Sequence, residues 1–305
     1  MFYEKLLIRL RKERFTPAAV GRYTVALSRR VRESLYENPE FIRSLLVVTL
    51  VLFGFIFVLA VWFSIVIDRV TGVRLLLWSS GWLVLAFLWA LVHTGLSRDP
   101  NGVPVSRVSV PNVLSLLRFS LVPGLFLLIM SGKIGYAIVL FVAGALSDVA
   151  DGFVARRFSQ ETRMGLVLDP LVDMALNMSV MWALSLSGRL SLLLSLLLTV
   201  RYALLLGGAA YIYLFRGPVR IQPTVFGKLS AVFLSAMLVM LMYLHDYGAP
   251  LVRDRISGLL GIALGILLAG TILHVLIMGI YSLRLYPRVV SVEEESARRE
   301  TGLGL

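Results

Sequence analysis

The stretch from residue 148 to residue 173 reads DVADGFVARRFSQETRMGLVLDPLVD, and it lies between two runs that are almost purely apolar. A carboxylate at the edge of the hydrocarbon region of a membrane is costly, so such acids are candidates for a functional site. If both ends of the stretch are helical, Asp148 and Asp151 project from one helix face, and so do Asp169 and Asp173. The stretch therefore predicts two acid pairs on two neighbouring membrane helices.

Residues 157–164 between the two acid pairs are polar enough to form a bend that returns the second helix beside the first. All four carboxylates could then converge, although two like charges about 4 Å apart repel by roughly 4 kcal/mol at an effective dielectric near 20. Protons or cations must therefore accompany them. Two divalent ions would balance the four charges, and carboxylate oxygens suit Mg²⁺, Mn²⁺ or Ca²⁺. Such a site beside a bilayer indicates transfer of a phosphorus group.

The composition is that of a membrane protein. The 305 residues are 58% hydrophobic and have a mean hydropathy of +0.85, which is well above the range of a soluble domain. The chain has no cysteine, which excludes disulfides, thiolate zinc sites and cysteine nucleophiles. The net charge of +12 is concentrated beside the apolar runs. We attribute this charge to attraction toward anionic lipid headgroups and to the positive-inside bias of membrane proteins. We expect no nucleic-acid partner.

We predict an all-α integral membrane protein of about eight spans, in which an N-terminal transmembrane hairpin precedes a six-helix core. Residues 1–43 carry ten Lys or Arg against five Glu and form a basic amphipathic segment. The hairpin occupies 44–97, a linker rich in helix breakers occupies 98–110, the six-span catalytic domain occupies 111–286, and a tail occupies 287–305. Both termini and the acid pairs are then cytoplasmic, in the cell inner membrane if the protein is bacterial.

Two connections between the predicted spans are expected to be loops of several residues, at 68–74 and at 245–255. Gly258, Gly261 and Gly265 are expected to pack within the chain or, alternatively, to form the face of a homodimer.

Eight residues of the acid-bearing stretch form the pattern Asp148-x2-Asp151-Gly152-x2-Ala155-Arg156-x8-Gly165-x3-Asp169-x3-Asp173. This pattern matches the signature of the CDP-alcohol phosphatidyltransferase family at every fixed position. The resemblance covers residues 111 to about 285, and Pro111, Asn112, Ser115 and Arg118 are similar to the family's first-helix entry. It implies a reaction in which an alcohol attacks the lipid-linked phosphorus of a CDP-lipid and releases CMP.

The resemblance is strongest to the branch of phosphatidylglycerophosphate synthases and eukaryotic-type cardiolipin synthases, in which Asp169 is followed by Pro170. Met174 and Tyr202 depart from this branch, which commonly has a Lys and an acid at those positions. The hypotheses for the acceptor are glycerol 3-phosphate first, phosphatidylglycerol second and another small alcohol third. A divalent-cation transporter is the alternative from another class of function.

The family resemblance also implies residue roles. Asp148, Asp151 and Asp169 would hold one Mg²⁺ or Mn²⁺ ion, and Asp148, Asp169 and Asp173 the other. Asp173 would also be the general base that takes the proton of the acceptor hydroxyl. The residues expected to bind CDP-diacylglycerol are Asn112, Ser115, Gly152, Ala155, Arg156 and Thr162.

Three cationic residues, Arg201, Arg220 and Lys228, are candidates for the acceptor pocket, since an anionic acceptor needs cationic partners. Arg201 stands within an apolar run, where an unpartnered charge is costly. Several of these assignments have simpler alternatives. Arg156 could be an interfacial arginine, Arg220 and Lys228 could follow the positive-inside rule, and the hydroxyl and amide residues could be helix caps.

Overall fold

The computed structural model describes residues 10, 13, 15–99, 102–158, 160, 162–215 and 224–285. Over these residues the chain is almost entirely helical, with an isolated β-bridge between Arg98 and Pro104. Eight of the helices described are long and apolar enough to cross a membrane. The predicted all-α integral membrane fold is confirmed.

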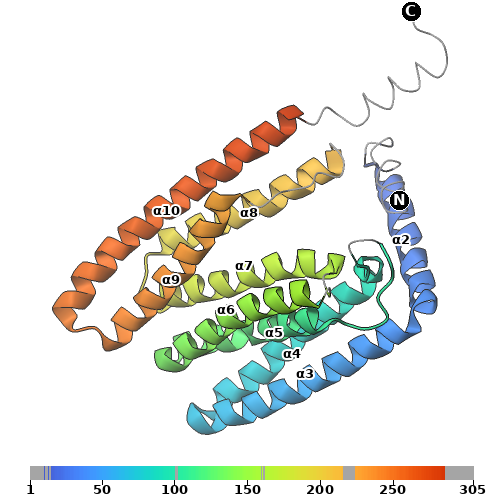
Figure 1. Cartoon of the computed structure of the whole chain (residues 1–305). Helices are drawn as coiled ribbons and strands as arrows, with labels where there is room; N and C mark the ends of the chain where they lie inside the picture. Colours follow the sequence, from blue (N-terminus) through green and yellow to red (C-terminus); the bar gives the residue numbers. More distant parts are fainter. Residues whose placement is uncertain are drawn as a thin grey trace, which may run out of the picture. The chain divides into compact units, whose positions relative to one another are not determined.

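Several of the helices follow one another directly, such as α3 and α4 or α9 and α10, whereas α4 and α5 are joined by the longer segment 93–109 (Figure 1). The candidate spans are α3 to α10, preceded by the amphipathic α2, and a short 3₁₀ helix, η1, follows α4. Their bounds are α2 Pro17–Glu37, α3 Pro39–Val66, α4 Arg69–Val92, η1 Thr94–Leu96, α5 Val110–Met130, α6 Ile134–Arg157, α7 Arg163–Leu186, α8 Leu192–Phe215, α9 Val225–Tyr247 and α10 Pro250–Leu285. The predicted tail at 287–305 lies outside the described residues.

The predicted loop at 68–74 is wrong, because α4 begins directly after a capping residue. Asp68 accepts hydrogen bonds from the backbone N–H of Thr71 at 2.9 Å and from its hydroxyl at 2.6 Å. A carboxylate in this position satisfies an N–H that the first turn of a helix leaves free. The bond from the Thr71 hydroxyl, with the one from its backbone, lowers the pKa of Asp68.

The predicted loop at 245–255 is also wrong. Helix α9 continues to Tyr247 and α10 already begins at Pro250. Proline is favoured at the first position of a helix, where its missing N–H has no partner to lose and its φ angle is already helical.

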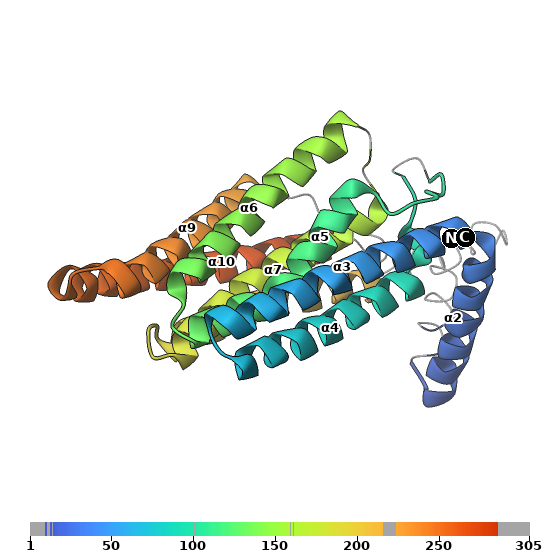
Figure 2. The same ribbon diagram turned by 90° about the horizontal axis from the view of Figure 1, so that it is seen from below.

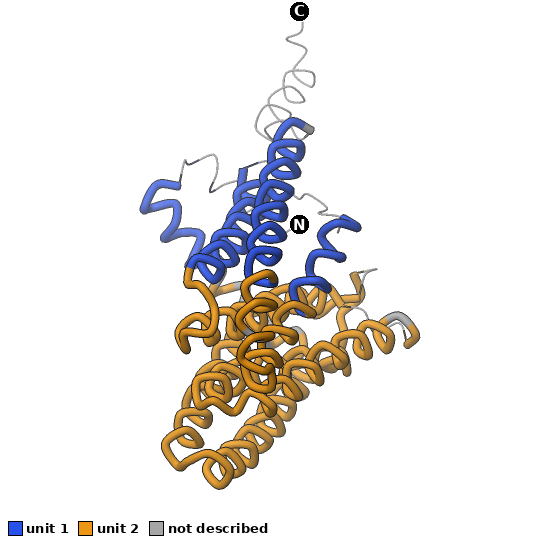
Figure 3. Tube along the Cα trace, turned by 90° about the vertical axis from the view of Figure 1, so that its left-hand side faces the viewer, with its two compact units in different colours: residues 1–26, 193–235, 260–305 blue, residues 27–192, 236–259 orange. Residues whose placement is uncertain are grey.

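The described helices belong to two compact units (Figure 3). One unit comprises residues 27–192 and 236–259, and it contains all four aspartates of the motif. The other comprises residues 1–26, 193–235 and 260–305.

Helix α5 is the central helix of the unit that holds the aspartates. It packs against α7, α6, α4 and α3, and Figure 2 shows it between the α3–α4 hairpin and the helices that carry the acids. Its most apolar stretch is 61% buried, against 17% for α6 and 50% for α7. The Ser179 hydroxyl of α7 donates to the Val122 carbonyl of α5 at 3.0 Å. The position of the acid-bearing helices therefore depends on α5.

The α3–α4 hairpin is closely packed because glycine lets its helices approach one another. A Cβ atom on Gly72 of α4 would lie 2.5 Å from the backbone oxygen of Ala60 on α3. The hairpin also lies against α5, since a Cβ on Gly124 would lie 3.1 Å from Leu75 of α4. The hairpin thus covers a face of the central helix.

Glycines of α10 pack against α8 in the other unit. A Cβ on Gly265 would lie 3.4 Å from Leu194, and one on Gly261 would lie 4.0 Å from it. The expected packing within the chain is confirmed for these two glycines. A Cβ on Gly258 would meet no described atom within 4 Å. A homodimer through this helix stays a prediction.

We expect Gly72→Ala to lower the free energy of unfolding by about 1–3 kcal/mol, since the new methyl group meets the α3 backbone and overpacks the hairpin. Thermal unfolding in detergent measures this loss. Gly54→Ala on α3 is the matched control, because its Cβ would meet nothing within 4 Å. Equal stability of the two variants would contradict the close approach of α3 and α4.

Candidate active site

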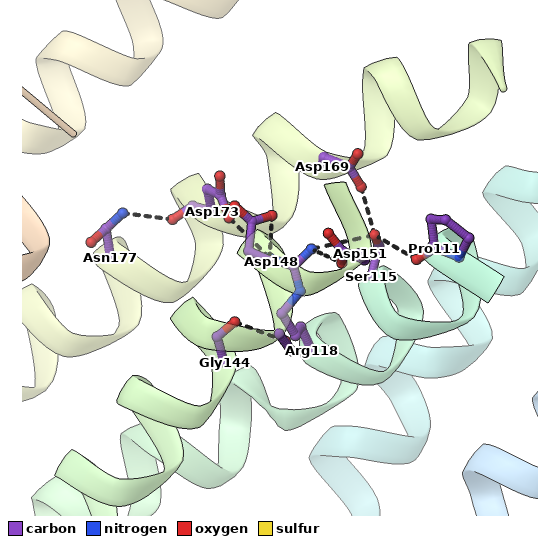
Figure 4. Close-up of polar contacts among 10 residues, drawn as sticks. Pro111, Ser115, Arg118, Gly144, Asp148, Asp151, Asp169, Asp173 and Asn177 are labelled. Carbon is purple, nitrogen blue, oxygen red and sulfur yellow. Dashed lines mark hydrogen bonds and ion pairs between the residues drawn. The ribbon is translucent and has the colours of Figure 1, made fainter. Parts of the chain in front are cut away.

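The four aspartates of the motif come from two helices and meet beside a third. Asp148 and Asp151 lie near the C-terminal end of α6, and Asp169 and Asp173 lie in the first half of α7. Figure 4 shows their side chains directed toward residues of α5. The sequence predicted that each pair shares a helix face, and the structure places both pairs where polar groups of α5 reach them.

A buried arginine of α5 joins three of these aspartates. Arg118 is only 3% exposed, and its Nη1 donates to Asp148 at 2.7 Å and to Asp173 at 3.3 Å. Its Nη2 donates to Asp151 at 2.8 Å (Figure 4). Charge-assisted hydrogen bonds of this length are among the strongest polar contacts in proteins. Arg118 therefore connects both acid-bearing helices to α5.

The fourth aspartate is held by a serine of the same helix. The Ser115 hydroxyl lies 2.5 Å from Oδ1 of Asp169 and 3.1 Å from the carbonyl oxygen of Pro111. Nη2 of Arg118 also donates to the Ser115 oxygen, at 3.4 Å. Ser115 is fully buried, whereas Asp169 is half-buried.

The carboxylates differ in their access to solvent. The side chain of Asp151 is 4% exposed, whereas those of Asp148 and Asp173 are 39% and 49% exposed. Asp148 and Asp173 are therefore the carboxylates that a ligand can reach first, and Asp151 lies behind them.

A second polar contact joins the start of α7 to α5. The Thr162 hydroxyl caps α7 by accepting from the N–H of Gly165 at 3.1 Å, and Nδ2 of Asn112 donates to Thr162 at 3.0 Å. Both side chains are buried. The interpretation of Thr162 as a helix cap is confirmed, and the pair Asn112–Thr162 fixes α7 against α5. Their predicted contact with the nucleotide stays a prediction.

Gly152 and Ala155 lie on α6 after the first acid pair, and both are half-buried. Arg156 lies on α6 as well, but its side chain is outside the described residues. These three residues therefore follow the first acid pair on the same helix, and their contact with CDP-diacylglycerol stays a prediction.

The predicted acceptor residues lie elsewhere in the chain. Arg201 is on α8, where its guanidinium lies 5.3 Å from the centre of the Tyr202 ring, and Lys228 is in the first turn of α9. Both belong to the unit without the aspartates. Arg220 is outside the described residues. The acceptor role of all three stays a prediction.

Arg118 is the residue of the cluster to which the sequence pattern assigns no role. The sequence nevertheless contains a pattern that points to Arg118, because Asn112, Ser115 and Arg118 are spaced three residues apart. On a helix this spacing puts the three polar side chains on one side, within an otherwise apolar span. A polar stripe of this kind predicts a partner on neighbouring helices.

The donor set of the cluster suits hard divalent cations. It consists only of carboxylate oxygens, which Mg²⁺ and Mn²⁺ prefer. If all four carboxylates are ionised, one guanidinium leaves three negative charges unbalanced (−4 + 1 = −3). Within the described residues no group of three or more His, Asp or Glu side chains is arranged to hold a metal ion. The cation that lies between the acids is the guanidinium of Arg118.

Comparisons with known proteins agree with the motif. The family model for CDP-alcohol phosphatidyltransferase matches residues 108–279. A CDP-diacylglycerol–glycerol-3-phosphate 3-phosphatidyltransferase from Aquifex aeolicus is 33% identical over 149 residues, which are 48% of this chain and 82% of that protein.

Two further relatives carry the name cardiolipin synthase (CMP-forming). The one from Streptomyces coelicolor is 34% identical over 111 residues, 34% of this chain and 52% of that protein. The one from Rattus norvegicus is 39% identical over 69 residues, 22% of this chain and 23% of that protein.

We expect Gly165→Ala to lower the free energy of unfolding by about 1–3 kcal/mol, because its Cβ would lie 2.8 Å from Oδ1 of the buried Asn112. Thermal unfolding in detergent checks this. Gly144→Ala on α6 is the control, since its Cβ would make only an ordinary contact, 3.9 Å from Leu176. If both variants unfold at the wild-type temperature, α5 and the start of α7 are not packed as described.

Proposed function

Because the chain belongs to the CDP-alcohol phosphatidyltransferase family, we propose that it transfers the phosphatidyl group of CDP-diacylglycerol to an alcohol at the acid cluster. The acceptor hydroxyl oxygen forms a bond to the lipid-linked phosphorus. The bond from that phosphorus to the bridging oxygen of the diphosphate breaks, and CMP leaves. The observation that carries the proposal is the assembly of all four motif aspartates beside α5.

The four aspartates would hold two Mg²⁺ or Mn²⁺ ions, which supply charge to stabilise the diphosphate and the departing CMP. Asp148, Asp151 and Asp169 would bind one ion, and Asp148, Asp169 and Asp173 the other. The all-oxygen donor set and the unbalanced negative charge of the cluster support this assignment.

Asp173 would take the proton from the acceptor hydroxyl. It is the most exposed of the three aspartates that contact Arg118, and its contact with that guanidinium is the longest, at 3.3 Å. Asp169 is instead engaged by Ser115, and Asp151 is buried. A general base has to be within hydrogen-bond reach of the incoming hydroxyl, and Asp173 meets this requirement best.

The substrate CDP-diacylglycerol would lie along the surface of α6 that follows the first acid pair. Gly152 and Ala155 have small side chains, which leave room for the cytidine, and the Arg156 guanidinium suits the diphosphate. Asn112 and Thr162 would line the nucleotide from α5 and the start of α7, where their mutual hydrogen bond holds them. Ser115 would act through its bond to Asp169.

Glycerol 3-phosphate is the acceptor that we propose first. The relative named for this substrate is covered over 82% of its length, whereas the cardiolipin synthases from Streptomyces coelicolor and rat are covered over 52% and 23%. Arg201, Arg220 and Lys228 would bind its phosphate group. Phosphatidylglycerol is the second candidate, on the strength of those two cardiolipin synthases.

The reaction would take place on the cytoplasmic side of the membrane. Asp151 and Asp169 each lie six residues inside a helix end (157 − 151 and 169 − 163), or about 9 Å along the axis. Asp148 and Asp173 lie nine and ten residues inside the same ends (157 − 148 and 173 − 163), or about 14–15 Å. The position of the shallower two carboxylates supports chemistry near the membrane surface over transport of a cation through the bilayer midplane. The basic residues 1–43 and the even number of candidate spans support cytoplasmic termini.

The purified protein should release CMP from CDP-diacylglycerol with Mg²⁺ or Mn²⁺, and fastest with glycerol 3-phosphate among a panel of alcohols. CMP release and the lipid product are measured together. Faster release with phosphatidylglycerol would move the assignment to the cardiolipin-synthase type. No CMP with any acceptor would contradict the proposed reaction.

Asp148→Asn and Asp169→Asn should each lower the rate of CMP release by at least roughly 100-fold. Loss of a residue that only supports a metal ligand costs up to about 100-fold, and loss of a direct ligand should cost at least as much. Asn keeps the shape of the side chain and removes its charge. Asp246→Asn, at an exposed position near the end of α9, is the control and should keep the wild-type rate. Full activity of either motif variant would refute the metal assignment.

A further inference from the structure

We propose that Arg118 is the resident counter-ion of the acid cluster, a positioning residue that draws the aspartates of α6 and α7 to one point before any metal binds. This inference rests on the proposed function only in taking the acid cluster to be a metal-binding active site. The guanidinium and the metal ions would share the same carboxylate oxygens, so the two are linked thermodynamically.

The burial of Arg118 requires such a role. The residue is 3% exposed within an apolar span, and a charge there is costly unless ionic and hydrogen-bonding partners compensate it. Its two terminal nitrogens are directed at Asp148, Asp151, Asp173 and Ser115, while Nε has no hydrogen-bond partner among the residues that the structure describes. Both terminal nitrogens of the side chain are thus turned to the cluster.

The packing of the helices makes α5 the natural place for this counter-ion. Both α6 and α7 pack extensively against α5. The two acid pairs therefore approach each other beside α5, and like charges brought together there repel strongly. A planar guanidinium can donate to several carboxylates at once, which an ammonium group on a flexible stem does less well.

The charge count indicates that Arg118 and metal ions have complementary tasks. With all four carboxylates ionised and the guanidinium alone, the cluster would carry three negative charges (−4 + 1 = −3), and with two divalent ions added it would carry one positive charge (−3 + 4 = +1). A site with a net positive charge suits a diphosphate better than a neutral one. Loss of Arg118 should therefore harm the metal-free protein most, because four carboxylates would then lack any cation.

The test is thermal unfolding of Arg118→Gln in detergent, once with a chelator and once with saturating Mg²⁺. We expect the metal-free variant to unfold roughly 10 °C below the metal-free wild type. Most of this loss should be recovered in Mg²⁺, so the rise in Tm on metal binding is larger in the variant than in the wild type. Arg118→Lys keeps the charge and should show an intermediate metal-free loss.

Arg189→Gln is the matched control, since Arg189 belongs to the same unit but contacts the Ile129 carbonyl instead of an acid. Its rise in Tm with Mg²⁺ should equal that of the wild type. Equal losses for Arg118→Gln with and without Mg²⁺ would overturn the proposal, because an ordinary packing residue behaves in that way. No loss in either condition would overturn it as well.

If Arg118→Gln folds only in Mg²⁺, its unfolding on addition of chelator supports the proposal. If Arg118→Gln folds in neither condition, the Tm of Arg118→Lys is compared with that of the wild type with and without Mg²⁺. Equal losses of Tm in the two conditions overturn the proposal. These readouts need no turnover. A protein that shows the Tm pattern but releases no CMP would contradict the proposed function and leave the counter-ion role standing.

Discussion

The ion pairs between Arg118 and the aspartates are the interaction on which the polar centre of this membrane protein depends. An isolated charge of either sign is expensive inside an apolar helix bundle. Here one buried guanidinium meets Asp148, Asp151 and Asp173 within 2.7–3.3 Å. Each group reduces the cost of burying the other.

This interaction explains why α5 is central although it carries none of the four acids. The family match begins at residue 108, just before α5, and thus includes the helix that supplies Ser115 and Arg118. Two polar contacts bind α7 to this helix, one at Asp169 and one at the capping residue Thr162. A motif whose four acids lie on two helices is therefore part of a three-helix structure.

The α3–α4 hairpin lies before the residues that the family model matches, yet it belongs to the same compact unit as the acids. Its Leu75 lies against α5 near Gly124, and the rings of Trp82 and Phe119 stack at 5.1 Å. Burial of a helix by apolar neighbours restricts its motion and lowers the local dielectric. The hairpin thus contributes to the environment in which Arg118 and the acids interact.

The helical elements and the pairing of the acids on helix faces were predictable from the sequence, because both depend on local features. The length of each apolar run predicted the eight spans, and the spacing of the aspartates predicted which of them share a helix face. Where local capping decided the boundaries, at Asp68 and Pro250, the predicted loops were too long.

Which cation pairs with the acids follows only from the folded chain. Arg118 is 30, 33 and 55 residues away in the chain from Asp148, Asp151 and Asp173. The polar stripe that contains it predicts that a partner exists, but does not say which one. The packing of α6 and α7 on α5 decides that, since electrostatic pairing depends on distance in space and not on distance along the chain.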